Sequence, residues 1–178
     1  AWPGGRRGRP GLGQVTAASL SVAPNALEFW RERLTEHGAM VGASETRFGE
    51  TVLPFHDPDG LRLELVPAAG DARPGWADGP IPAPYAIRGV HAVTLPEQSV
   101  DWTAALMGDG TFADVQAAPT FLPGQIAVGN IHHIAWRTPD DAQQGTWLRE
   151  ISGLGLGVSP VMDRDYFHSI YFREPGGI

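Results

Sequence analysis

The sequence predicts an α+β protein built from tandem βαβββ modules, and three observations support this prediction. Residues 14–66 have the pattern of a strand, an amphipathic helix and then three short strands. Residues 129–178 repeat this order, with matching residues 117 positions further along the chain. Finally, 23 Gly and 16 Pro in 178 residues are typical of many short strands joined by tight turns.

The first copy of the module is predicted from alternation and from helix periodicity. Residues 14–22 alternate well enough for a strand. The next segment places Leu27, Trp30 and Leu34 on one helical face, and Gly38 follows as a candidate C-terminal cap. Three strands and a tight turn complete the module: Gly42–Arg47, Glu50–His56, a turn at 57–60, and Leu61–Val66.

The second copy is predicted from the constant offset. Trp30 matches Trp147, Arg47 matches Arg164, and the turn sequence D-P-D-G-L at 57–61 matches E-P-G-G-I at 174–178. The expected elements of this copy are a first strand at His132–Pro139, a helix at Asp140–Gly153 and further strands within Val158–Phe172.

The remaining segments connect or supplement these copies. Residues 1–13 form a Gly/Pro/Arg-rich loop, and residues 67–86 form a Pro/Gly/Asp-rich linker. Residues 87–128 indicate a shortened module. Its expected elements are a strand at Ile87–Leu95, a short helix at Val100–Met107 and a weak strand region at Thr111–Val128. Because the chain begins with Ala and ends in mid-pattern, we expect it to be part of a longer polypeptide.

The amino-acid composition and the net charge limit the kinds of binding partner that we expect for the protein. The apolar fraction of 42% and the charged fraction of 19% are typical of a soluble globular protein, which we expect to be cytoplasmic. A net charge of -7 argues against nucleic acid or an anionic membrane surface as a partner. The chain has no cysteine, which excludes disulfides, thiolate metal ligands and a cysteine nucleophile.

An adjacent histidine pair lies in the β-prone segment G-N-I-H-H-I-A-W-R-T-P, residues 129–139. Successive side chains of a strand point to opposite faces, so His132 and His133 are expected in different environments. A neutral imidazole on a concave sheet face is a ready ligand for a divalent metal. The alternative is that one histidine packs against a neighbouring element and the other is solvated.

The tandem βαβββ order, the H-H-I-A-W strand and the ending Y-F-H-S-I-Y-F-R-E-P-G-G resemble the vicinal oxygen chelate superfamily. More narrowly, they resemble the bacterial hydroquinone-type ring-cleaving dioxygenases, over about residues 4–178. The resemblance implies four modules that form cupped, incomplete β-barrels with helices packed outside. Residues 1–13 would then be the tail of a missing first module, 87–128 a shortened third module, and 129–178 a metal-bearing module lacking its last strand.

The resemblance also implies Fe(II), sometimes Mn(II), held by two histidines and one glutamate. His133 matches one histidine ligand. The other is expected in the first module, and the glutamate three places beyond Ile178, so two of three ligands have no counterpart in this sequence.

Three further residues match positions near the metal. His132 is a candidate for acid–base or hydrogen-bonding work, although a regular strand would point it away from the metal. Arg164 is a candidate to pair with a phenolate or an anionic oxygen species, and Tyr171 to donate a phenolic proton. For Arg164 and Tyr171 purely structural roles remain open, since Arg47 of the other copy matches Arg164.

Three functions are compatible with these residues. The histidine pair and the aromatic ending favour an Fe(II)-dependent ring-cleaving dioxygenase that acts on hydroquinone or catechol-like aromatics with O2. The alternatives are a glyoxalase-type metal-dependent lyase or isomerase, and a metal-free module that binds an aromatic or antibiotic. A homo-oligomer remains open. Glu64 of the other copy is expected to be a relic or a salt-bridge partner, because Thr16 and Ala17 replace its histidine.

Overall fold

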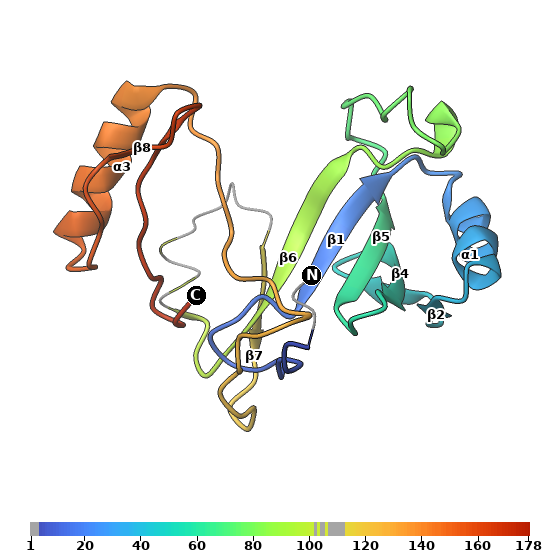
Figure 1. Cartoon of the computed structure of the whole chain (residues 1–178), viewed down its shortest axis with the longest axis horizontal. Helices are drawn as coiled ribbons and strands as arrows, with labels where there is room; N and C mark the ends of the chain where they lie inside the picture. The colour runs from blue at the N-terminus through green and yellow to red at the C-terminus, as the bar shows by residue number, and fades with distance from the viewer. Residues whose placement is uncertain (1–3, 102, 104–105, 107–112) are drawn as a thin grey trace.

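The computed structural model describes residues 4–101, 103, 106 and 113–178 of the chain (Figure 1). Within these residues a seven-stranded sheet has the order β2-β4-β5-β1-β6-β7, with β3 paired to β4 outside that path. Its strands are β1 Ala17–Val22, β2 Met40–Val41, β3 Glu45–Arg47, β4 Glu50–His56, β5 Arg62–Pro67, β6 Gly89–Glu97 and β7 Ala113–Ala117. The other elements are the helices α1 Leu27–Glu36 and α3 Asp141–Gly153, the 3-10 helix η1 Ala83–Tyr85, and the short hairpin strands β8 Met162–Asp163 and β9 His168–Ser169. The predicted α+β class is confirmed, and the open sheet agrees with the predicted cupped shape.

The first copy forms its elements where the sequence places them. Strand β4 occupies the predicted range, β5 is shifted by one residue, and β3 lies inside the predicted strand Gly42–Arg47. Helix α1 ends as expected, since Gly38 adopts a positive φ of 74° and donates its N–H to Thr35 O. No helix in the described part of the chain is both long and apolar enough to cross a bilayer.

The main core lies between α1 and the sheet. The predicted face of α1 points inward: Trp30 is buried, and Leu27 and Leu34 are partly buried against the same cluster. Trp30 Nε1 donates to Tyr85 O at 2.8 Å, and the Phe29 ring stacks on the Tyr85 ring at 4.4 Å. The end of the linker therefore closes over the helix. The buried members of this core are Val22, Ala23, Ala26, Trp30, Leu53, Phe55 and Leu65.

Strand β1 joins two segments into one sheet. It pairs in parallel with β5, which belongs to its own module, and antiparallel with β6, which belongs to residues 87–128. Strand β6 then pairs in parallel with β7. Figure 1 shows α3 and β8 well away from this sheet, on the side opposite α1.

The hairpin of the second copy repeats the register of the first at an offset of 117. The first copy pairs Glu45 with Val52, Thr46 with Thr51 and Val41 with Phe55. The second pairs Met162 with Ser169, Asp163 with His168 and Val158 with Phe172. Even the left-handed residue recurs, because Phe48 has φ 51° and Asp165 has φ 65°. The repeat seen in the sequence is therefore a repeat of backbone hydrogen bonding.

A carboxylate closes the matching turn in each copy. Asp57 Oδ1 accepts the N–H groups of Asp59 at 2.9 Å and Leu61 at 2.8 Å. In the second copy Glu174 accepts those of Gly176 at 2.6 Å and Ile178 at 2.8 Å. The longer side chain of Glu174 thus accepts the backbone N–H groups of its turn in the same way as Asp57 does in the first copy.

Two predictions for the second copy are wrong in detail. The segment His132–Pro139 is not a strand, and the bridge of Val15 with Ile131 is the nearest pairing the described residues provide. A strand needs ladder partners, and at this offset the counterpart of β5 would be residues 179–184, which are not in the sequence. The strands expected within Val158–Phe172 shorten to β8, β9 and one bridge.

Other expected elements have mixed outcomes. Helix α3 is confirmed, with Asp140 as its N-cap accepting the N–H of Gln143 at 2.8 Å. Strand β7 lies inside the predicted weak strand region. The helix predicted at Val100–Met107 falls largely outside the described residues, as does the start of that strand region at Thr111.

Replacement of the buried Trp30 tests the core. Trp30→Ala is expected to lower the free energy of unfolding by about 3–5 kcal/mol, because it removes a large buried ring and leaves a cavity. Urea denaturation measures this change. Trp76→Ala is the matched control, since Trp76 is 65% exposed and its loss is expected to cost far less. Equal losses for the two variants would contradict the assigned core.

Candidate active site

The four residues predicted to surround the metal lie next to one another in a His-Tyr-Arg cluster, comprising His132, His133, Tyr171 and Arg164. The Nδ1 atoms of the two histidines are 3.2 Å apart. The His133 and Tyr171 ring centroids are 6.5 Å apart, and Arg164 Cζ lies 5.6 Å from the Tyr171 ring centroid. The fold of the second copy therefore brings together residues up to 39 positions apart in the sequence.

The expectation that His132 and His133 face different environments is wrong. Because their segment lacks a strand ladder, side-chain alternation does not apply, and the two imidazoles meet edge-on with centroids 5.4 Å apart. A hydrogen bond between two Nδ1 atoms requires one protonated and one unprotonated nitrogen. If His133 donates, its Nε2 carries a lone pair, and no partner for that atom is found among the described residues.

The backbone of the hairpin positions Tyr171. Ser159 N donates to Tyr171 O at 2.8 Å, and Tyr171 N donates to Ser159 Oγ at 2.9 Å. The ring is 44% exposed, so its hydroxyl can reach a bound molecule.

Arg164 stands beside the left-handed Asp165, and its N–H donates to Phe167 O at 3.0 Å. Its guanidinium contacts Met162 Sδ at 3.7 Å and has no carboxylate partner among the described residues.

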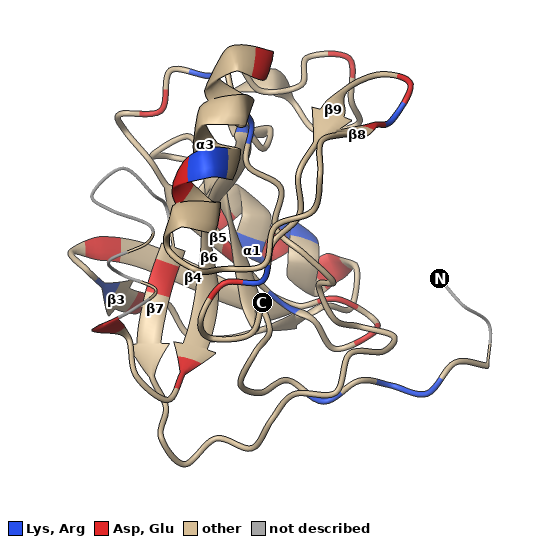
Figure 2. Ribbon diagram, turned by 90° about the vertical axis from the view of Figure 1, so that its left-hand side faces the viewer, with Lys and Arg blue, Asp and Glu red and all other residues tan. Residues whose placement is uncertain are grey.

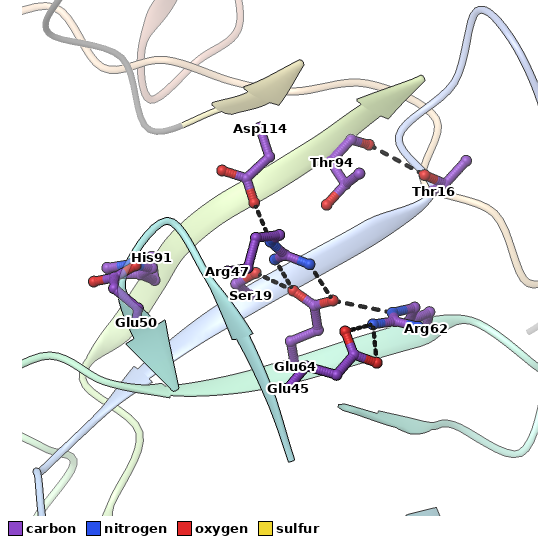
Figure 3. Close-up of polar contacts among 10 residues, drawn as sticks. All are labelled: Thr16, Ser19, Glu45, Arg47, Glu50, Arg62, Glu64, His91, Thr94 and Asp114. Carbon is purple, nitrogen blue, oxygen red and sulfur yellow. Dashed lines mark hydrogen bonds and ion pairs between the residues drawn. The ribbon is translucent and has the colours of Figure 1, made fainter. Parts of the chain in front are cut away.

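The matching arginine of the first copy is fully engaged (Figure 3). Arg47 donates to both carboxylate oxygens of Glu64 and forms an ion pair with Asp114 at 2.9 Å. Glu64 also accepts from Ser19 Oγ at 2.6 Å and from Arg62 Nε at 3.0 Å. Glu64 is completely buried, and its expected role as a salt-bridge partner is confirmed.

These contacts set the protonation of the buried carboxylates. Burial alone would raise the pKa of Glu64, but hydrogen bonds from Arg47, Ser19 and Arg62 outweigh it and lower the pKa to about 2. For Asp114 burial prevails over Arg47, and its pKa is raised. Glu64 is thus an ionised group whose oxygens are already occupied by donors, which leaves it unsuited to bind a metal.

A cavity of about 460 Å³ lies over this ion-pair network and not at the His-Tyr-Arg cluster. It lies between the first copy and residues 87–130, and its polar lining includes Thr16, Arg47, Arg62, Glu64 and Thr94. Most of the charged groups that line the cavity pair with each other. In the first copy the ion-pair network therefore occupies the position that corresponds to the implied metal site of the second copy.

The residues present fit one ligand of the implied metal. His133 offers an imidazole nitrogen, and the Nδ1 atom of His132 lies 3.2 Å from its Nδ1. Within the described residues no group of three His, Cys, Asp or Glu side chains could hold a metal ion together. The described part of the chain therefore supplies part of a site.

Comparisons with known proteins agree with this geometry. The chain is 38% identical over 199 residues to a candidate ring-cleaving dioxygenase of Bacillus subtilis strain 168, MhqO. It is 29% identical over 202 residues to the chlorohydroquinone/hydroquinone 1,2-dioxygenase of Sphingobium indicum. A crystal structure of a candidate dioxygenase from Bacillus subtilis superposes with a TM-score of 0.89 at 36% identity.

Over nearly its whole length the chain is similar to the hydroquinone-type ring-cleaving dioxygenases of the vicinal oxygen chelate superfamily. Maize glyoxalase I, a V278E mutant, shares the fold at a TM-score of 0.55 and 14% identity, over 95% of this chain and 66% of its own. No protein-family model matches the chain.

The match covers nearly all of this chain but only part of its relatives. Coverage of this chain is 99% for MhqO, 98% for the Sphingobium enzyme and 99% for the crystal structure. The chain in turn spans 63% of each of the two curated relatives and 64% of the crystallised protein.

Sequence reasoning missed most of the partners of Glu64. Arg62 could have been found, since residues two apart share one face of a strand. Ser19 could not, and neither could Asp114, the second partner of Arg47, because their proximity depends on the parallel register of β1 with β5 and on the β6–β7 pairing.

Removal of the guanidinium tests the network. Arg47→Met is expected to lower the free energy of unfolding by about 3 kcal/mol, because Glu64 then stays buried without its main partner. Urea denaturation measures this change in the free energy of unfolding. Arg62→Met is the control, and it is expected to lower the free energy of unfolding by less, because Arg62 is more exposed than Arg47.

The difference in unfolding free energy between wild type and Arg47→Met is expected to depend on pH. The pKa of Glu64 is lowered from 4.5 to about 2, so its contribution is fully present above pH 4.5 and is lost as the pH falls toward 2. The difference between wild type and Arg47→Met is expected to shrink across that window. A difference that grows on acidification would contradict the assignment.

Proposed function

We propose that this protein is an Fe(II)-dependent ring-cleaving dioxygenase that acts on hydroquinone or catechol-like aromatics with O2, with Mn(II) as the alternative metal. The observation that carries the proposal is the His-Tyr-Arg cluster, which brings an imidazole, a phenol and a guanidinium together. The names of the relatives support the same reaction class. Because the chain spans 63% of those relatives, the activity of the whole protein is part of the proposal.

Each residue of the cluster has a role that follows from its contacts. His133 supplies one metal ligand through Nε2, and its Nδ1–H donates to His132, which fixes the orientation of the ring. A bound ferrous ion would supply the capacity to bring a phenolic substrate and O2 together and to pass electrons between them. The other two ligands that the family implies have no counterpart in this sequence.

Tyr171 and Arg164 act on the substrate side of His133. The phenolic O–H of Tyr171 can donate to, or accept a proton from, a substrate oxygen bound beside His133. The guanidinium of Arg164, which has no carboxylate partner among the described residues, stabilises a phenolate or another oxygen anion. In the first copy Arg47 is already neutralised by carboxylates, so the same position there cannot serve an external anion.

Partner and location remain predictions. The expected partners are a small aromatic substrate and O2, and the expected location is the cytoplasm. Figure 2 shows Asp and Glu positions scattered together with basic ones over helices, strands and loops, which supports the expectation of no nucleic-acid or membrane partner. A homo-oligomer remains open.

Oxygen uptake tests the proposed reaction. Full-length protein purified without oxygen and loaded with Fe(II) is expected to consume O2 only when hydroquinone is added, and to yield a ring-opened acid detected by mass spectrometry. Bound metal without oxygen uptake would favour the glyoxalase-type lyase or isomerase. Aromatic binding without any metal would instead favour a binding module.

Substitution of the tyrosine tests its proton-transfer role. Tyr171→Phe is expected to lower kcat by about 100-fold, because general acid–base groups typically contribute at least this much. The matched control is Tyr166→Phe on the same hairpin, whose side chain is 95% exposed and is expected to leave kcat unchanged. Equal kcat values for Tyr171→Phe and wild type would assign Tyr171 a purely structural role.

A further inference from the structure

Two buried glutamates share one hydroxyl group where β6 meets the turn at the end of the second copy. Thr103 Oγ1 lies 2.6 Å from Glu97 Oε2 and 2.7 Å from Glu174 Oε2. Exposure is 2% for Glu97, 5% for Glu174 and zero for Thr103. A Cβ placed on Gly176 would lie 2.5 Å from Glu97 Cδ and 2.9 Å from Glu174 Oε1, so both carboxyl groups crowd the same point.

If both carboxyls are ionised, there are too few hydrogens for both short contacts of the Thr103 hydroxyl to be hydrogen bonds. A threonine hydroxyl carries one hydrogen and can donate to one of its two neighbours. Because two carboxyl oxygen atoms lie within 2.7 Å of Thr103 Oγ1, a second hydrogen is required, and one of the two carboxyl groups must carry it. An additional ionised carboxylate would also be left buried beside another, which is costly.

The contacts decide which glutamate holds this hydrogen. Glu174 accepts backbone N–H groups on both oxygens, from Gly176 and Ile178, so both of its oxygens already act as acceptors. Glu97 Oε1 is buried and has no hydrogen-bond partner among the described residues. Neither carboxyl has an arginine partner there, and Glu174 is the charged group that faces Glu97.

We propose that Glu97 is protonated at neutral pH and, through Thr103, forms a proton-dependent latch that holds the turn of Glu174 against β6. Glu97 donates to Thr103 Oγ1, and the Thr103 hydroxyl donates to the Glu174 carboxylate. The latch joins the end of β6 to the turn that follows the His-Tyr-Arg cluster in sequence. It opens when Glu97 loses its proton.

The pH dependence has a defined sign. Burial raises the pKa of Glu97, the hydrogen bond with Thr103 lowers it, and the charge of Glu174 raises it, with a raised pKa as the net result. The latch then stabilises the fold fully below the ordinary pKa of a glutamate, and this contribution is lost as the pH rises through the raised pKa of Glu97. The Glu64 network has the opposite dependence.

Carbon NMR of glutamate side chains in the intact protein tests the proposal. With selective labelling, one glutamate carboxyl is expected to keep the chemical shift of a neutral acid at neutral pH. That signal is expected to vanish in Glu97→Gln and to persist in the control Glu32→Gln, whose side chain is exposed on α1. A wild-type protein with every glutamate ionised at neutral pH would overturn the proposal, whether or not the variants fold.

Amide exchange separates the latch from general packing. Glu174→Gln is expected to speed hydrogen exchange of the Gly176 and Ile178 amides by about tenfold or more. The reason is that the substitution removes the negative charge of the carboxylate that accepts hydrogen bonds from these two N–H groups. Glu97→Gln is expected to leave both rates unchanged, since its amide can donate to Thr103 in place of the acid. Equal acceleration in both variants, or stabilisation of the wild type by added Ca2+, would instead assign the pair two charges and a bound cation.

Discussion

The structure depends on the pairing of strand β1 with partners on both sides. Its ladder with β5 completes the first copy, and its ladder with β6 joins residues 87–128 to the same sheet. The matching segment of the second copy has one bridge, to Val15, and stays irregular. One copy of the module is therefore built into a sheet with a filled core, while the other carries the histidine pair on a segment without a ladder.

The two copies use the same scaffold position in different ways. Arg47 lies beside the buried Glu64 and Asp114, and the resulting network neutralises the charges over which the cavity lies. Arg164 occupies the equivalent place on an equivalent hairpin, but it contacts the Tyr171 ring and has no carboxylate partner among the described residues. The first copy thus gains stability from a closed ion-pair network. In the second copy the position equivalent to Glu64 is residue 181, which lies beyond the end of the sequence.

Local signals predicted the elements of this fold well. The strand predicted at Glu50–His56 and the apolar face of α1 depend on residues close together in the sequence, and both predictions are confirmed. The family resemblance, and not the repeat, predicted the proximity of His133, Tyr171 and Arg164, because these residues belong to one copy of the module. The side-by-side placement of His132 and His133 could not be predicted, since it depends on whether a distant strand provides a ladder. The same applies to the contact of Glu64 with Ser19, which depends on register.

We propose that the second copy binds the metal and that Glu64 of the first copy has only a structural role. Iron content of the anaerobically purified full-length protein tests this most directly, with His133→Ala compared with Glu64→Gln. The account predicts that His133→Ala loses bound iron, while Glu64→Gln retains it at the wild-type ratio despite lower stability. Retention of iron by His133→Ala, together with its loss from Glu64→Gln, would contradict the account.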